Sequence, residues 1–252
     1  MATPKHRLDQ FLVEQGIFPS RQKAQAAILA GEVLVNDQVI TKAGHTVREN
    51  DHIRLKQSFP YVSRGALKLL HALDTFHLSP EGQVAIDIGS STGGFTQVLL
   101  ERGARLVYAI DSGTNQLDWK LRSDPRVICR ENTNARYLRP EDFDPSPTFA
   151  TIDVSFISLT KILPPLVTIL AIPFTIVCLI KPQFEVGPEL VGEKGFVDPS
   201  HHPKAWEIVL TCAHQLKLKT SQIIPSPITG QKSKNQEYLI ALFSQQGEKD
   251  EL

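Results

Sequence analysis

Between residues 84 and 243, short apolar runs alternate with segments of helical periodicity. No other feature of this 252-residue chain constrains its fold as strongly. The expected strands are 84–88, 106–110, 127–129, 149–152, 174–180, 221–224 and 238–243. The expected helices between them are 95–101, 115–121, about 162–171 and 203–215. Strands that alternate with helices predict an α/β fold, a mostly parallel sheet with helices on both faces. The two consecutive strands at the end predict an antiparallel edge.

Residues 1–57 have the pattern of a separate small α+β module. Helices are expected over 7–13 and 21–30, each followed by a glycine, and strands over 33–35, 38–40 and 52–56. Ser20 is a good N-cap for the second helix.

A linker is expected over 58–62 and a second domain over 63–252. That domain is expected to begin with a helix over 63–76, capped by Ser63 and carrying Leu67, Leu70 and Leu73 on one face.

The charge of the chain is divided unevenly between these two parts. The whole chain has 27 Lys and Arg against 27 Asp and Glu, which excludes a molecule coated in positive charge. Residues 1–57 have eight basic and six acidic side chains, a net charge of +2, so the remaining 195 residues have −2. A neutral total therefore conceals a mildly basic module joined to a more acidic domain.

Several patterns argue against a membrane, secretory or metal-binding protein. The uncharged stretch 162–180 has the length of a membrane span, but three prolines interrupt it, and we interpret it as a buried helix and strand. The ending Lys249–Leu252 spells an ER-retention signal, but the N-terminus lacks an apolar leader, which favours a cytoplasmic location. Cys129, Cys178 and Cys212 are too few and too widely spaced for a disulfide framework or a zinc site, so no metal is expected.

A glycine-rich loop follows the first strand of the sheet. Glycines let the backbone turn sharply and approach a ligand, and the following helix offers free N–H groups. Asp111 ends the next strand, where an acid can accept both hydroxyls of a ribose. Together these features predict an adenosine-containing cofactor, whereas a plain glycine turn and an exposed helix-capping acid remain the alternatives. The candidate cofactor-binding residues in the loop are Asp87, Gly89, Ser90, Thr92, Gly93, Gly94 and Phe95.

Two lysines and two acids are candidates for catalysis. Asp153 and Lys181 each follow a strand directly, and the carboxyl ends of parallel strands are where such folds place ligands. Glu237 begins the last strand, and Lys68 lies on the helix before the sheet. Taken singly, each lysine or glutamate can be an ordinary exposed side chain. If the four converge in one cleft, they indicate chemistry on a polar substrate.

The small module has basic and hydroxyl side chains on or beside its helices. Arg7, Ser20, Arg21 and Lys23 can contact phosphates, although a solvated helix face would have the same composition.

The assembled motifs resemble a known family. Residues 6–56 resemble the RNA-binding module of ribosomal protein S4, in Arg7-Leu8-Asp9, Ser20-Arg21-Gln22-Lys23-Ala24, Ile28-Leu29-Ala30-Gly31 and Val33-Leu34-Val35-Asn36. Residues 61–243 resemble FtsJ-like ribose 2′-O-methyltransferases, in Tyr61-Val62-Ser63-Arg64-Gly65, the glycine loop, Asp153-Val154-Ser155-Phe156 and Lys181-Pro182-Gln183-Phe184-Glu185. The combination is similar to the TlyA (haemolysin A) family of ribosomal RNA cytidine 2′-O-methyltransferases.

This resemblance implies a Rossmann-like class I methyltransferase sheet with S-adenosylmethionine as the methyl donor. It implies ribosomal RNA or ribosomal subunits as the partner, and a catalytic tetrad of Lys68, Asp153, Lys181 and Glu237. It also places Asn134 and Asp153 beside the cofactor, and Arg64 among the RNA-binding residues.

Three alternatives to this function stay open at this point. Another RNA-modifying enzyme, such as a pseudouridine synthase, needs no adenosine cofactor and so disagrees with the glycine loop and Asp111. A membrane-active haemolysin disagrees with the proline-interrupted apolar run. An RNA-binding protein with an inactive methyltransferase fold is separated from an enzyme by a measurement of cofactor binding.

Overall fold

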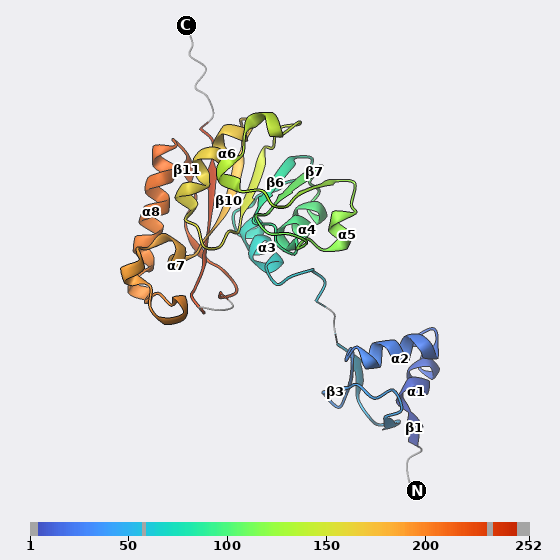
Figure 1. The fold of residues 1–252 in the computed structure, drawn as a ribbon. Helices are drawn as coiled ribbons and strands as arrows, with labels where there is room; N and C mark the ends of the chain where they lie inside the picture. Colours follow the sequence, from blue (N-terminus) through green and yellow to red (C-terminus); the bar gives the residue numbers. More distant parts are fainter. Residues whose placement is uncertain (1–4, 57–58, 231–233, 246–252) are drawn as a thin grey trace. The chain divides into compact units, whose positions relative to one another are not determined.

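The computed structural model describes residues 5–56, 59–230 and 234–245. The chain divides into two compact units, Met1–Pro60 and Tyr61–Leu252 (Figure 1). Ser58 of the expected linker and the ending Lys249–Leu252 lie outside the described residues.

The first unit consists of two helices, a three-stranded sheet and a separate strand pair. Its elements are β1 (Lys5–Arg7), α1 (Leu8–Glu14), α2 (Arg21–Leu29), β2 (Val33–Val35), β3 (Gln38–Ile40), β4 (Thr46–Arg48) and β5 (Ile53–Leu55). The order β3-β2-β5 confirms the predicted sheet, while the antiparallel pair β1-β4 was not predicted. Asn36 and Asp37 join β2 to β3 with φ of 50° and 65°, the left-handed geometry that a two-residue hairpin turn needs.

The second unit is built on an eight-stranded sheet. Its path is β11-β13-β10-β9-β6-β7-β8, and β12 pairs with β13. The strands are β6 (Val84–Ile88), β7 (Leu106–Ile110), β8 (Val127–Arg130), β9 (Phe149–Ile152), β10 (Thr175–Ile180), β11 (Lys219–Thr220), β12 (Ile224–Pro225) and β13 (Tyr238–Phe243). β6 to β10 are parallel to one another, whereas β13 pairs antiparallel with β10. This confirms the predicted parallel sheet with an antiparallel edge.

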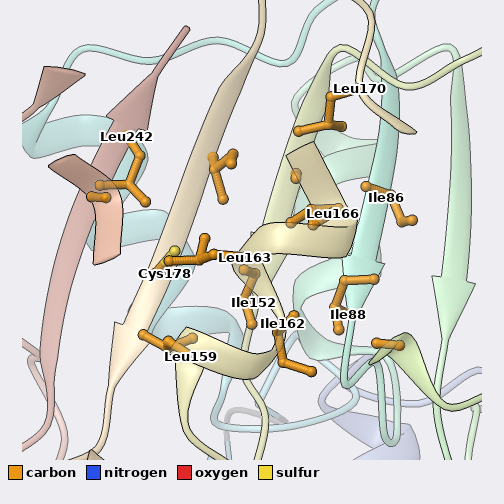
Figure 2. Packing of buried hydrophobic residues seen from close by; sticks show 14 of the residues in the cluster. Ile86, Ile88, Ile152, Leu159, Ile162, Leu163, Leu166, Leu170, Cys178 and Leu242 are labelled. Atoms are coloured by element: carbon orange, nitrogen blue, oxygen red, sulfur yellow. The ribbon is translucent and has the colours of Figure 1, made fainter. Parts of the chain in front are cut away.

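Helices cover both faces of this sheet. They are α3 (Ala66–Thr75), α4 (Gly94–Glu101), α5 (Trp119–Arg122), α6 (Leu163–Ile169), α7 (Pro182–Glu185) and α8 (His202–Gln215). Along β6, Ile86 and Ile88 pack in the same cluster as α6 and α8, while Ala85 packs with α3 and α4. Figure 2 shows α6 laid across the strands, with Leu163 and Leu166 against the side chains of the sheet.

The uncharged stretch 162–180 forms α6 and β10 inside this core, as predicted. Ile176–Ile180 of β10 are at most 1% exposed, because both faces of a central parallel strand are covered. Among the described residues, none of the helices has the length and apolar character needed to cross a membrane.

Three local predictions were wrong. The helix after the linker begins at Ala66 with Gly65 as its N-cap, and its buried face contains Leu69 rather than Leu67. The helix expected over 115–121 is only α5, because the backbone N–H groups of 115–117 donate to the Glu131 carboxylate instead of forming a helical turn. Of the strand expected over 221–224, only Ile224 lies in a strand, β12; β11 ends before this range at Thr220, where the Ser221 hydroxyl accepts the N–H of Ala241 at 3.0 Å.

The strand order reverses between β6 and β9. The chain runs from β6 outward to β7 and β8, then returns to β9 on the other side of β6. Open α/β sheets bind ligands outside the carboxyl ends of the strands at such a switch point. Gly89 and Asp153, the first residues after β6 and β9, lie at this place.

Candidate active site at the carboxyl ends of the central strands

The loop from β6 to α4 passes very close to the loop after β9. Gly89 has φ of +83°, and a Cβ placed on it would lie 2.5 Å from the carbonyl oxygen of Asp153. A side chain at this position is therefore excluded both by the backbone conformation and by the neighbouring chain. Ser90, the next residue, is 4% exposed, and its hydroxyl has no hydrogen-bond partner among the described residues. A buried hydroxyl in this state is suited to a polar ligand.

Asp87 lies behind the loop and not on its ligand side. It is fully buried, and its carboxylate accepts hydrogen bonds from the hydroxyls of Thr96 at 2.7 Å and Thr151 at 2.9 Å. Burial raises the pKa of this carboxyl to about 6, against the lowering effect of the two hydroxyls. Asp87 thus ties β6, β9 and α4 together beneath the loop.

Asp111 stands at the end of β7, where the sequence predicted a ribose-binding acid. Its two carboxylate oxygens accept from the backbone N–H of Ser91 at 2.8 Å and of Gly113 at 2.7 Å. Each oxygen retains a further lone pair for a ligand hydroxyl. Asp111 and Asn134 line a hollow of about 410 Å³ that also contains Gly89 and Asp153.

The four predicted catalytic side chains come together in one ion-pair cluster. The Lys68 ammonium lies 2.6 Å from Glu237 Oε2 and 3.6 Å from Asp153 Oδ2. The Lys181 ammonium lies 2.6 Å from Asp153 Oδ1 and donates to the Ser155 hydroxyl at 2.9 Å. The side chains of these four residues are between 4% and 19% exposed, so water screens the cluster only weakly.

This cluster lines a second, larger hollow of about 570 Å³. It shares Gly89, Ser91, Asp153, Ser155 and Phe156 with the hollow beside Asp111, so the two are adjoining parts of one site. Ser90, Thr92, Gly94, Phe95 and Arg64 also line the larger hollow. Of the predicted cofactor-binding residues, Asp87 and Gly93 line neither. A Cβ on Gly93 would collide with the side chain of Leu121, which shows that this glycine is needed for packing.

Glu185 is a buried carboxylate behind the site, lining neither hollow, that sequence reasoning missed. It is 8% exposed and accepts from the Ser158 hydroxyl at 2.6 Å and from the backbone N–H of Leu159 at 2.9 Å. Burial raises its pKa, while the two hydrogen bonds lower it. Glu185 therefore connects α7, which follows Lys181, to the end of the loop that begins with Asp153. Its place in the motif Lys181–Glu185 is the one sequence signal that could have found it.

In the first unit, a buried acid organises the predicted RNA-binding arginines. Asp9 is fully buried and accepts from Arg7 at 3.1 Å, from Arg21 Nε at 2.9 Å and from the Gln25 amide at 2.7 Å. The Arg7 hydrogen bond is the largest cause that holds the pKa of Asp9 well below its usual range. Both guanidinium side chains remain 49% exposed and thus available to a ligand. Ser20 caps α2, as predicted, by accepting from the backbone N–H of Lys23 at 3.3 Å, and Lys23 itself is exposed.

Comparison with known proteins gives two family matches. Residues 61–243 match the FtsJ-like methyltransferase model, and residues 6–53 match the S4 domain model. The 16S/23S rRNA (cytidine-2′-O)-methyltransferase TlyA of Mycobacterium tuberculosis is 41% identical over 242 residues, which cover 95% of this chain and 90% of that protein. Hemolysin A of Brachyspira hyodysenteriae is 42% identical over 235 residues, covering 92% and 98% of the two chains.

A solved structure is also similar over almost the whole chain. It is a Streptococcus thermophilus protein that carries the hemolysin label, 45% identical, with a TM-score of 0.73. The match covers 98% of this chain and 90% of that one.

Proposed function

This chain belongs to the TlyA family of FtsJ-like rRNA 2′-O-methyltransferases, and from that premise we propose that Lys68, Asp153, Lys181 and Glu237 promote methylation of a cytidine 2′-hydroxyl in ribosomal RNA. The observation that carries the proposal is the ion-pair cluster at the switch point of the sheet. Two lysines and two acids from four separate elements meet there beside a glycine loop.

S-adenosylmethionine fits the residues that surround this cluster. It has hydroxyl, amine and carboxylate groups. The Ser90 hydroxyl, which has no hydrogen-bond partner in the described part of the chain, and the Asp111 carboxylate offer matching hydrogen-bond groups. Gly89 lets the glycine loop lie directly against the loop after β9, and both loops line the hollow beside Asp111. When it is bound, this cofactor supplies an electrophilic methyl group. Ser90, Asp111 and Asn134 are the residues that we assign to hold it.

Lys181 is the residue that acts on the substrate hydroxyl. A ribose hydroxyl is a poor nucleophile until its proton is removed or its developing negative charge is stabilised. Lys181 serves either as the base or as the cation beside this oxygen, and Asp153 orients it through the 2.6 Å contact. Lys68 bridges Asp153 and Glu237 and so holds the network in place. Positioning of the hydroxyl accounts for much of the remaining acceleration.

The S4-type module of residues 1–57 is the part that we assign to rRNA recognition. Asp9 holds Arg7 and Arg21 in defined positions, and a prepositioned guanidinium loses less freedom on contact with a phosphate. The catalytic domain then begins after the linker at 58–62. Because ribosomal RNA or ribosomal subunits are the partner that we propose, we place the protein in the cytoplasm.

The test is methyl transfer by the Lys181→Ala variant. We expect this change to abolish methylation of ribosomal RNA, while S-adenosylmethionine still binds with close to wild-type affinity in calorimetry. Lys161→Ala removes an exposed lysine outside the cluster and serves as the matched control, with activity unchanged. Full activity of Lys181→Ala would contradict the assignment.

A further inference from the structure

Gln183 lies in the hollow of the catalytic cluster and has no role in the chemistry described above. It is on α7, two residues after Lys181, and its side chain is half-buried. It lines the same hollow as Lys68, Asp153, Lys181 and Glu237. Its amide oxygen Oε1 accepts a hydrogen bond from Asn235 Nδ2 at 2.9 Å.

Asn235 is held in one orientation by two backbone groups. It is 1% exposed, and its Oδ1 accepts from the backbone N–H of Val197 at 3.0 Å. Its Nδ2 donates to the carbonyl oxygen of Gly195 at 2.8 Å. A backbone N–H can only donate and a carbonyl can only accept, so exchange of the oxygen and nitrogen of Asn235 would break both bonds.

The orientation of Asn235 determines that of Gln183 in turn. The second hydrogen of Asn235 Nδ2 is donated to the Gln183 amide, and of the two atoms of that amide the oxygen is the one that can accept it. The Gln183 amide is therefore fixed with its oxygen towards Asn235. Its Nε2 group has no hydrogen-bond partner within the described part of the chain, and it is not sealed from solvent. Two amide hydrogens are thus left for a ligand in the hollow.

We propose that Gln183 contacts the target nucleotide and donates from this amide to an acceptor on it, with Asn235 as the positioning residue. The inference rests on the proposed function, because the target ribose must enter the hollow that holds Lys181. N3 is an acceptor in cytosine and a donor in uracil, whereas O2 is an acceptor in both bases. Ribose and phosphate oxygens are also acceptors in both nucleotides, so a contact to N3 and a contact to O2 or the backbone predict different selectivity.

Two substitutions of Gln183 test the contact. Gln183→Met keeps the approximate length of the side chain and removes both amide groups. Gln183→Glu keeps an acceptor for Asn235 and replaces the donor by a second acceptor. We expect each to lower kcat/KM for ribosomal subunits from a strain lacking the gene by about tenfold, the effect of one hydrogen bond to substrate. Calorimetry should give an unchanged affinity for S-adenosylmethionine. Gln222→Met, at an exposed glutamine outside both hollows, is the matched control.

The positioning role of Asn235 has its own variant. Asn235→Asp retains the acceptor for Val197 and loses the donor to Gln183, so it should show a loss in kcat/KM similar to that of Gln183→Met. The double variant should then lose little more than either single one, because both changes remove the same contact. Additive losses would contradict the positioning role.

Subunits with uridine at the methylated position then separate the two possible contacts. If the amide contacts N3 of the base, wild type prefers cytidine and Gln183→Met loses much of that preference. If it contacts O2, ribose or phosphate, the variant loses the same factor on both substrates. Wild-type kcat/KM in both Gln183 variants of an active enzyme would overturn this inference alone, as would a loss explained by weaker cofactor binding. A wild-type protein without methyl transfer would overturn the proposed function and this inference with it.

Discussion

Replacement of Asp87 by asparagine should make the catalytic unit more stable at neutral pH. The carboxyl is fully buried, and its pKa rises from the ordinary 3.8 to about 6 because burial penalises the charged form. An acid with a raised pKa binds its proton more readily in the folded chain than in the unfolded chain. The free energy of unfolding therefore falls as the pH rises from 3.8 to about 6.

The size of this effect follows from the shift. About two pKa units correspond to about 3 kcal/mol of stability that the wild type lacks above pH 6. Asparagine cannot ionise, and its amide can accept from one of the hydroxyls of Thr96 and Thr151 and donate to the other. Asp87→Asn should thus gain up to about 3 kcal/mol at pH 7.5, and this gain should disappear near pH 4.

Denaturant unfolding between pH 4 and pH 8 measures this difference. The two tryptophans, Trp119 and Trp206, both lie in the second unit, so their fluorescence reports its unfolding. Asp124→Asn is a control of opposite sign, because Arg126 lowers the pKa of Asp124 and the charged form stabilises the fold at neutral pH. The reasoning would be refuted if Asp87→Asn were less stable than wild type by the same amount at every pH, including pH 7.5.

Substitutions at Glu185 and Asp9 test two other buried carboxylates. Glu185→Ala leaves the buried N–H of Leu159 without its acceptor and should lower the free energy of unfolding by about 1–3 kcal/mol. It should also lower kcat, because the loop that begins with Asp153 loses its attachment to α7. Glu185→Gln keeps an acceptor and should restore most of the stability and most of the activity. Unfolding and single-turnover assays measure these effects, and equal damage from Ala and Gln would contradict the hydrogen-bond argument. Asp9→Ala frees Arg7 and Arg21, whose reordering should weaken rRNA binding by about tenfold or more in a filter-binding assay. Net charge alone predicts the opposite, so tighter binding by Asp9→Ala would refute the positioning of the arginines.

The order of strands and helices in the catalytic unit was predictable because each element has a strong local pattern. β10 is a continuous apolar run, and it lies in the sheet between β9 and β13, covered on both faces. The absence of helix over 115–117 was not predictable, because the acceptor of these backbone N–H groups is Glu131, a residue 14 to 16 positions away. Tertiary hydrogen bonds replaced the local ones there.

The same distinction applies to the candidate site. Asp153 and Lys181 were candidates from the sequence, since a polar residue directly after a parallel strand must lie at the carboxyl edge of the sheet. Lys68 and Glu237 had no such signal, and only the fold brings them to 2.6 Å from each other across 169 residues of chain. Asp87 was grouped with the glycine loop by sequence, but the side-chain direction along β6 places it among Thr96 and Thr151.

By itself, the sequence determined the type of sheet, the position of its ligand-binding edge and two of the charged groups on that edge. Periodicity and the ends of strands are properties of a single segment, so they can be recognised from the sequence of that segment alone. Only the tertiary structure decided which buried polar groups became partners, as in Asn235 with Gln183 and Asp9 with its two arginines. The reason is that a buried donor must find an acceptor within about 3 Å, and that acceptor can come from any part of the chain that packing brings there.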